Sequence, residues 1–272
     1  MFKTGLSTCG KPICEELFKS YKEAGIDVLE ITVDKTEYPT LDLDMISQLS
    51  EKYGVPVWSY HLPFAPFDKI NPSVRSVRDG TLTYFEELIS KASKIGVDKF
   101  VVHPSGETEP EARAEALECA RETFGMLAKI GKKYGATIAV EVLPRTCLGN
   151  CSEEINYLIS ADDSLRVCLD TNHLLKEDIV DFIHNVGDKI ITTHVSDYDF
   201  VDEKHWMPGE GKLDFSRVLK ALKEVGYNGP WLYEVGFKIP ATIERSRMLC
   251  CEDIARNAKE LFEGKEITLI NK

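Results

Sequence analysis

Short apolar runs alternate with longer amphipathic stretches along the whole chain. Eight runs are rich in Val, Ile, Leu or aromatic residues, and their four-to-eight-residue length is typical of parallel strands buried on both faces. The pattern therefore predicts eight strands, numbered one to eight in chain order. They cover residues 2–7, 28–33, 55–61, 99–103, 137–143, 166–170, 189–194 and 231–235.

The stretches between these runs have the features of helices. Residues 110–134 carry glutamates in the first turns and lysines in the last, which suits the helix dipole. Residues 73–95 and 214–225 are each followed by a glycine, a common stop at the C-terminal end of a helix. Eight strand–helix units of roughly 30 residues predict a (β/α)₈ TIM barrel, whose usual length is about 250 residues.

The main competing architecture is a doubly wound open sheet. That fold normally has a glycine-rich turn after its first strand, and the segment GLSTCGKP at 5–12 matches this fingerprint poorly. The chain has no linker, low-complexity stretch or strong internal repeat. We therefore predict one TIM-barrel catalytic domain over residues 1–272.

Polar side chains recur where the predicted strands end. Five of the six histidines lie at the end of an apolar run or in the loop just after one, and several carboxylates share that placement. Because strand ends of a barrel converge on one mouth, these groups should share a pocket with the composition of a divalent-metal site. The residues are Glu30, His61, His103, Glu141, Asp170, His173, His194, His205 and Glu234.

A buried carboxylate at a strand end needs a partner, because leaving it unpaired costs several kcal/mol. For a single residue, a helix cap or backbone hydrogen bonds explain such a group as well as a metal does. For Glu141, Asp170, His194 and Glu234 together, one metal ion is the better explanation.

Composition narrows the choice of substrate. The net charge is −12, and the acidic residues are spread along the chain, so the surface repels the phosphate backbone of nucleic acids. No apolar run has transmembrane length, and the first residues lack the apolar stretch of a signal peptide, so a cytoplasmic location is the default. The eight cysteines show no CxxC spacing and are interpreted as reduced thiols.

Seven segments, taken in order and with their spacing, resemble the xylose-isomerase-like TIM barrels. This is the sugar phosphate isomerase/epimerase superfamily that also includes endonuclease IV. The resemblance covers predicted strands three to eight. Its segments are YHLPF at 60–64, VVHPSGE at 101–107, VEVLPR at 140–145, CLDTNH at 168–173, THVSDYD at 193–199, HWMPGEG at 205–211 and LYEV at 232–235.

The resemblance implies one divalent metal ion held by Glu141, Asp170, His194 and Glu234. Three carboxylates and one imidazole favour Mn²⁺, Mg²⁺ or Co²⁺, with Zn²⁺ as an alternative. It also implies that the two glutamates are the catalytic acid–base pair. They would move a proton next to a sugar carbonyl through an enediolate that the metal stabilises. Epimerisation and aldose–ketose isomerisation both remain open.

Further residues are predicted to contact a small carbohydrate substrate. His173 should touch a hydroxyl, and Arg145 should bind a phosphate, a carboxylate or an anionic intermediate, unless it pairs with a loop carboxylate. His61 and His103 should bind hydroxyls, with a satisfied strand-end histidine as the alternative for each. His205 and the neighbouring Trp206 complete the predicted substrate-binding set: His61, His103, Arg145, His173, His205 and Trp206.

Two other reactions fit the same barrel. Endonuclease IV holds three Zn²⁺ ions, and its extra ligands correspond to His61, His103, His173 and His205, but Glu203 replaces an aspartate. The acidic segment 194–205 argues against DNA, so a nuclease ranks below the isomerase. Dehydration of a keto-inositol is the third reading, and a sugar-binding module is the least favoured. We expect no nucleic-acid or membrane partner. The identity and phosphorylation of the sugar and any homo-oligomer remain open.

Overall fold

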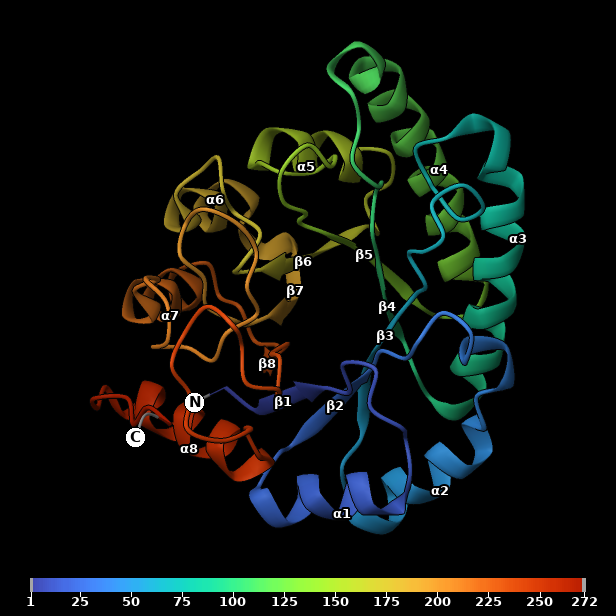
Figure 1. The fold of residues 1–272 in the computed structure, drawn as a ribbon. Helices are drawn as coiled ribbons and strands as arrows, with labels where there is room; N and C mark the ends of the chain where they lie inside the picture. Colours follow the sequence, from blue (N-terminus) through green and yellow to red (C-terminus); the bar gives the residue numbers. More distant parts are fainter. Residues whose placement is uncertain (1, 271–272) are drawn as a thin grey trace.

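The computed structural model describes residues 2–270, and its strands form a (β/α)₈ barrel (Figure 1). The eight strands are parallel, and their order in the sheet is β7-β6-β5-β4-β3-β2-β1-β8. This confirms the predicted fold class and excludes the doubly wound sheet. The strands are β1 Thr4–Ser7, β2 Val28–Ile31, β3 Val57–His61, β4 Lys99–Val102, β5 Thr137–Glu141, β6 Arg166–Asp170, β7 Ile190–His194 and β8 Trp231–Tyr233.

The barrel is nearly closed, because β7 and β8 meet just beyond the end of β7. Val195 forms a parallel bridge with Tyr233, and its N–H donates to the carbonyl of Leu232 at 2.8 Å. The N–H of Glu234 returns a bond to the carbonyl of Val195 at 3.1 Å. These bonds bring the end of β8 beside the end of β7 at the mouth.

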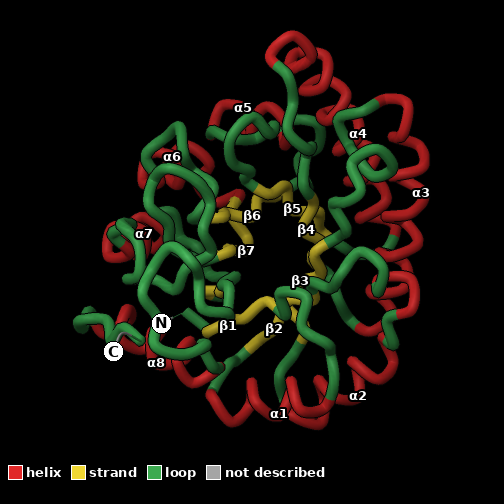
Figure 2. The backbone as a smooth tube through the Cα atoms, viewed as in Figure 1, coloured by secondary structure: helices red, strands yellow, loops and turns green. Residues whose placement is uncertain are grey.

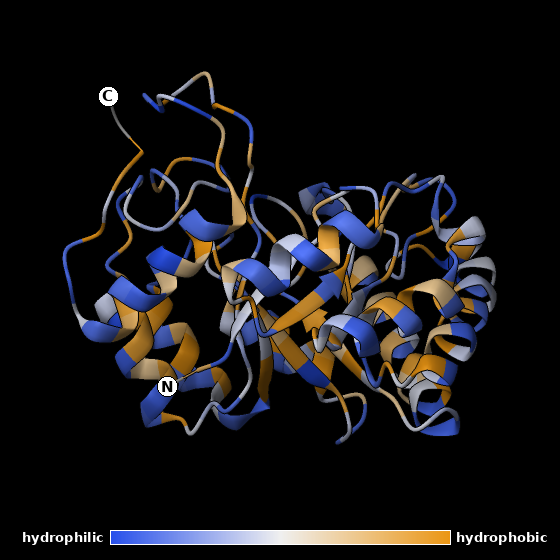
Figure 3. Cartoon of the chain, turned by 90° about the horizontal axis from the view of Figure 1, so that it is seen from below, coloured by the Kyte–Doolittle hydropathy of each residue, from blue (hydrophilic) through white to orange (hydrophobic). Residues whose placement is uncertain are grey.

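In the part of the chain that the structure describes, eight α-helices surround the strands (Figures 1 and 2). Their apolar faces pack on the barrel while their polar faces point outward, as the hydropathy colouring in Figure 3 shows. Within residues 2–270, none of the helices combines the length and the apolar character needed to cross a membrane. The helices are α1 Glu15–Ala24, α2 Leu43–Tyr53, α3 Arg75–Ala92, α4 Arg113–Lys133, α5 Ser152–Ile159, α6 Ile179–Val186, α7 Phe215–Glu224 and α8 Cys251–Glu263.

Helix α7 illustrates how sequence spacing produces this packing. Its buried residues include Phe215, Val218, Leu219 and Leu222, at the spacing of one helix face. The side chain of Asp214 caps the helix by accepting the N–H of Ser216. The local pattern is therefore enough to specify where this helix begins and which face it buries.

Each predicted apolar run contains one strand, but most runs extend past the strand that they contain. The run 137–143 shows why. After β5, the N–H of Leu143 donates to the carbonyl of Gly149, in the same loop. The backbone leaves the sheet at Leu143, although the side chain of Leu143 stays buried. The end of β5 is therefore set by a loop hydrogen bond, which apolar content does not reveal.

Candidate metal centre

Four side chains from the ends of four neighbouring strands converge at the mouth of the barrel. Glu141, Asp170 and His194 are the last residues of β5, β6 and β7, and Glu234 follows β8 directly. One ligand atom from each lies within 4.8 Å of the others. Nδ1 of His194 is 3.2 Å from Oε1 of Glu141, 3.3 Å from Oε2 of Glu234 and 4.0 Å from Oδ2 of Asp170. The structure thus brings together all four predicted metal ligands.

The chemistry of this group fits a divalent cation. Asp170 is fully buried, and its Oδ2 has no hydrogen-bond partner among the described residues. Burial raises the pKa of Asp170 to about 6, although His173 opposes the rise. A buried carboxylate oxygen without a donor is costly, and a cation removes that cost. Three carboxylates with one imidazole form the oxygen-rich set that Mn²⁺ or Mg²⁺ favours.

Two further histidines, His61 and His103, also contact Glu141. Nε2 of His61 and Nε2 of His103 lie 2.9 and 3.1 Å from its Oε2. Burial would raise the pKa of Glu141, but His103, His194 and His61 outweigh it and hold the pKa well below its usual range. Nδ1 of His61 is 2.8 Å from the carbonyl of Leu62, so Nε2 is the atom presented to Glu141. The two imidazoles can orient this carboxylate or bind a second ion with it.

A third group with metal-ligand geometry consists of His173, Glu203 and His205. Nδ1 of His173 lies 2.8 Å from the carbonyl of Val142, which leaves Nε2 facing Glu203 at 3.2 Å. Burial would lower the pKa of His173, but Asp170 and Glu203 outweigh it and raise the pKa to about 9. Glu203 is absent from the predicted site residues. Its place two residues before His205 was the available signal.

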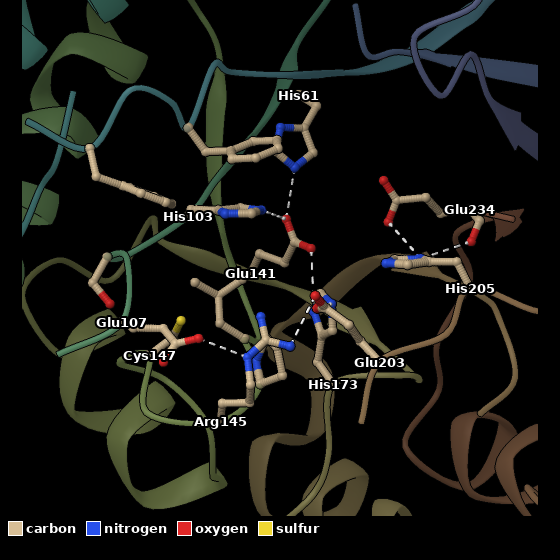
Figure 4. A pocket seen from close by; sticks show the side chains of 15 residues that line it. His61, His103, Glu107, Glu141, Arg145, Cys147, His173, Glu203, His205 and Glu234 are labelled. Atoms are coloured by element: carbon tan, nitrogen blue, oxygen red, sulfur yellow. Dashed lines mark hydrogen bonds and ion pairs between the residues drawn. The ribbon is translucent and has the colours of Figure 1, made fainter. Parts of the chain in front are cut away.

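A cavity of about 320 Å³ opens above the strand ends (Figure 4). Five of the six predicted substrate-binding residues line it, together with both glutamates of the predicted acid–base pair. Trp206 is the exception, because its side chain is buried outside this lining and its backbone pairs with Asp197. The lining residues are His61, Phe64, Phe67, His103, Ser105, Glu107, Glu141, Leu143, Pro144, Arg145, Cys147, His173, Glu203, His205 and Glu234.

Arg145 joins three loops at the edge of this cavity. Its guanidinium lies 2.9 Å from Glu107, 2.7 Å from Asp202 and 3.0 Å from Glu203. Burial would lower its pKa, but Asp202, Glu203 and Glu107 raise it above its usual value. Its backbone has φ 53°, a left-handed conformation that is strained for a side chain of this size. Of the two alternatives that the sequence leaves open for Arg145, the structure shows the pairing with loop carboxylates.

Asp197 is a buried residue that sequence reasoning did not select, and it organises the loop that carries His205. Its Oδ2 accepts the N–H groups of Gly209 and Gly211, and its Oδ1 accepts those of Tyr198 and Leu213. A Cβ at position 211 would collide with this carboxylate, so the close approach requires glycine there. No local signal distinguishes Asp197 from its acidic neighbours.

Comparison with known proteins agrees with this architecture. The family model described as xylose isomerase-like TIM barrel matches residues 18–249. An uncharacterized protein from Methanocaldococcus jannaschii is 29% identical over 220 residues, covering 76% of this chain and 74% of its own. A D-psicose 3-epimerase from Ruminiclostridium cellulolyticum is 22% identical over 254 residues, covering 89% and 84%. The crystal structure of a D-tagatose 3-epimerase-like protein superposes with a TM-score of 0.81 at 25% identity, covering 96% and 97%.

Proposed function

Since the chain belongs to the family of xylose isomerase-like TIM barrels, we propose that it is a metal-dependent sugar epimerase or isomerase. The observation that carries the proposal is the convergence of Glu141, Asp170, His194 and Glu234 on one point of the cavity. Two of the similar proteins are named for 3-epimerases of ketoses, D-psicose and D-tagatose, which supports this class of reaction.

The four converging residues would hold one divalent ion. When bound, such an ion polarises a carbonyl oxygen and stabilises the negative charge that develops there. His61 and His103 would keep Glu141 ionised and in place through its Oε2. This division of labour needs one metal and gives His61, His103 and His194 a role each.

Glu141 and Glu234 would transfer the proton. They come from β5 and from the end of β8, and both line the cavity (Figure 4). One carboxylate removes the proton next to the carbonyl, and the other protonates the opposite face, which inverts that carbon. Four imidazoles lie within 4 Å of the carboxylate of Glu141, whereas Glu234 is the more exposed of the two, with 16% of its side chain accessible. Of the two proposed bases, Glu234 is therefore the one with fewer neighbouring imidazoles and the more accessible side chain.

We further propose that the substrate is an unphosphorylated sugar. Of the described residues that line the cavity, Arg145 alone is an arginine or lysine, and three carboxylates already surround it. A phosphate would have to displace Asp202 or Glu203 while approaching a strongly acidic pocket. Uncharged hydroxyl groups carry no such cost.

Isotope exchange tests the reaction directly. The enzyme with Mn²⁺ is incubated in D₂O with free ketoses and with their phosphorylated forms, and deuterium is located by NMR. We expect deuterium at the carbon next to the carbonyl in at least one free ketose and none in the phosphorylated forms. Glu234→Gln is the matched control: without the second base it should form no epimer, and any deuterium exchange should be confined to the epimer whose proton faces Glu141. The absence of exchange with every sugar would refute the isomerase proposal.

The three metal-competent groups favour one alternative, a phosphodiesterase related to endonuclease IV. His61, His103, His173, Glu203 and His205 could hold two more ions beside the first. Metal analysis of the purified protein separates the readings, since the isomerase proposal expects one ion per chain. Three Zn²⁺ ions per chain, together with nicking of DNA at abasic sites, would support the nuclease instead.

A further inference from the structure

Glu30 is a fully buried carboxylate that the proposed reaction does not use. It lies on β2, which β1 and β8 separate from β7 in the barrel. Its Oε1 nevertheless lies 2.9 Å from Nε2 of His194, because both side chains point into the barrel interior. The contact is with Nε2, at the edge of the ring that faces away from the other predicted metal ligands. Those ligands lie around Nδ1.

The carboxylate of Glu30 and Nε2 of His194 have few partners apart from each other. Within residues 2–270, the carboxylate otherwise contacts two hydroxyls, those of Ser59 at 2.7 Å and Thr32 at 3.4 Å. Nε2 of His194 is buried and has no hydrogen-bond partner among the described residues. The pair meets the distance of an ion pair, but not the angle of a hydrogen bond.

The backbone of β2 places this carboxylate in register with its hydroxyl donor. The pairing of β2 with β3 shifts register between Leu29 and Glu30, so that Glu30 comes opposite Ser59. Such irregularities re-aim side chains, and they occur often beside functional sites. The hydroxyl of Ser7 donates to that of Thr32, which extends the support to β1.

We propose that Glu30 is a positioning residue that fixes which nitrogen of His194 binds the metal. By accepting a hydrogen bond from Nε2–H, it leaves Nδ1 as the lone-pair nitrogen that faces Glu141, Glu234 and Asp170. A carboxylate in this place orients a histidine ligand and raises its basicity. The inference rests on the proposed metal site and not on the identity of the sugar.

The test compares Glu30→Gln with Ser59→Ala. Glu30→Gln keeps the shape of the side chain but removes its charge and can present an amide group to Nε2. We expect its affinity for Mn²⁺, measured from the EPR signal of free Mn²⁺, to fall about 10–100-fold, the usual effect of losing an outer-shell partner. Ser59→Ala removes a hydrogen bond from Glu30 but leaves the contact with His194, so its affinity should change far less.

A spectroscopic readout separates positioning from a general loss of structure. In the Zn²⁺-loaded wild type, ¹⁵N NMR of labelled histidine should show His194 bound through Nδ1 and protonated at Nε2. In Glu30→Gln this Nε2–H signal should weaken or move. Wild-type affinity together with an unchanged His194 spectrum in Glu30→Gln would overturn the proposal. Equal losses in both variants would assign Glu30 a merely structural role. A wild type that binds no divalent ion would refute the metal site itself.

Discussion

Two sets of residues face the cavity, and the fold holds them in different ways. The strand-end group, Glu141, Asp170, His194 and Glu234, sits on or beside the parallel ladder, where Asp170 pairs in register with His194. The loop group, Arg145, His173, Glu203 and His205, lies on the connections after β5, β6 and β7. The first group is positioned by the sheet, and the second mainly by side-chain contacts among loops.

The loop group also carries backbone strain. Arg145 and His205 have φ values of 53° and 51°, and such residues cost of order 1–3 kcal/mol each. Ion pairs of Arg145 and the backbone contacts of Asp197 hold these loops in place. The contrast suggests a division in which strand ends supply the chemistry and loops supply the fit to a substrate. Four predictions test this division.

The largest effect is expected from the strand-end group. Glu141→Gln and Glu234→Gln each keep their shape but lose a proton acceptor, which is typically worth roughly 10²–10⁴-fold in rate. We expect kcat to fall by at least this factor while the circular dichroism spectrum stays that of the wild type. A rate within tenfold of the wild type in either variant would remove that glutamate from the acid–base pair.

Asp197→Asn should disturb the loops without touching the strand ends. The new amide group would face N–H donors where the carboxylate now accepts four of them. Hydrogen bonds to charged groups contribute roughly 1.5–3 kcal/mol each. We therefore expect the free energy of unfolding, measured in urea, to fall by about 3 kcal/mol. Asp199→Asn is the control, because Asp199 accepts two N–H groups near the surface. A loss in the control as large as in Asp197→Asn would contradict this interpretation.

Removal of the metal should destabilise the wild type by an intermediate amount. An ion at 100 times its dissociation constant stabilises the folded state by about 2.7 kcal/mol. Chelation should therefore lower Tm by several degrees, as measured by calorimetry. The shift should vanish in Asp170→Asn and persist in His205→Ala. If His205→Ala removes much of the shift, the loop group also binds metal, and the one-metal proposal fails.

Arg145 should give the smallest effect. Arg145→Ala breaks the link between three loops, so KM should rise about tenfold while kcat changes little. Arg145→Gly is the matched variant, because glycine adopts φ 53° without steric cost. It should be about 1 kcal/mol more stable than Arg145→Ala in urea. A loss confined to kcat would place Arg145 in the chemistry rather than in holding the three loops together.

Much of the fold was predictable because its signals are local. Each of the eight apolar runs contains a strand, and residues 166–170 match β6 to the residue. At the end of β5, the bond from Leu143 to Gly149 lies in a loop, and apolar content alone did not reveal it. The convergence of the four candidate metal ligands was predictable for a related reason. Strand ends of a barrel face one mouth, so positions along the chain translate into proximity in space.

The sequence by itself determined the barrel and the set of side chains that gather at its mouth. Only the tertiary structure decided how those side chains are partnered. In the structure, Arg145 pairs with three carboxylates, and Trp206 lies outside the cavity lining. Glu30 contacts Nε2 of His194. Periodicity reports the face on which a residue lies. It does not report the distances between side chains from different loops and strands, and these distances govern charge pairing and proton position.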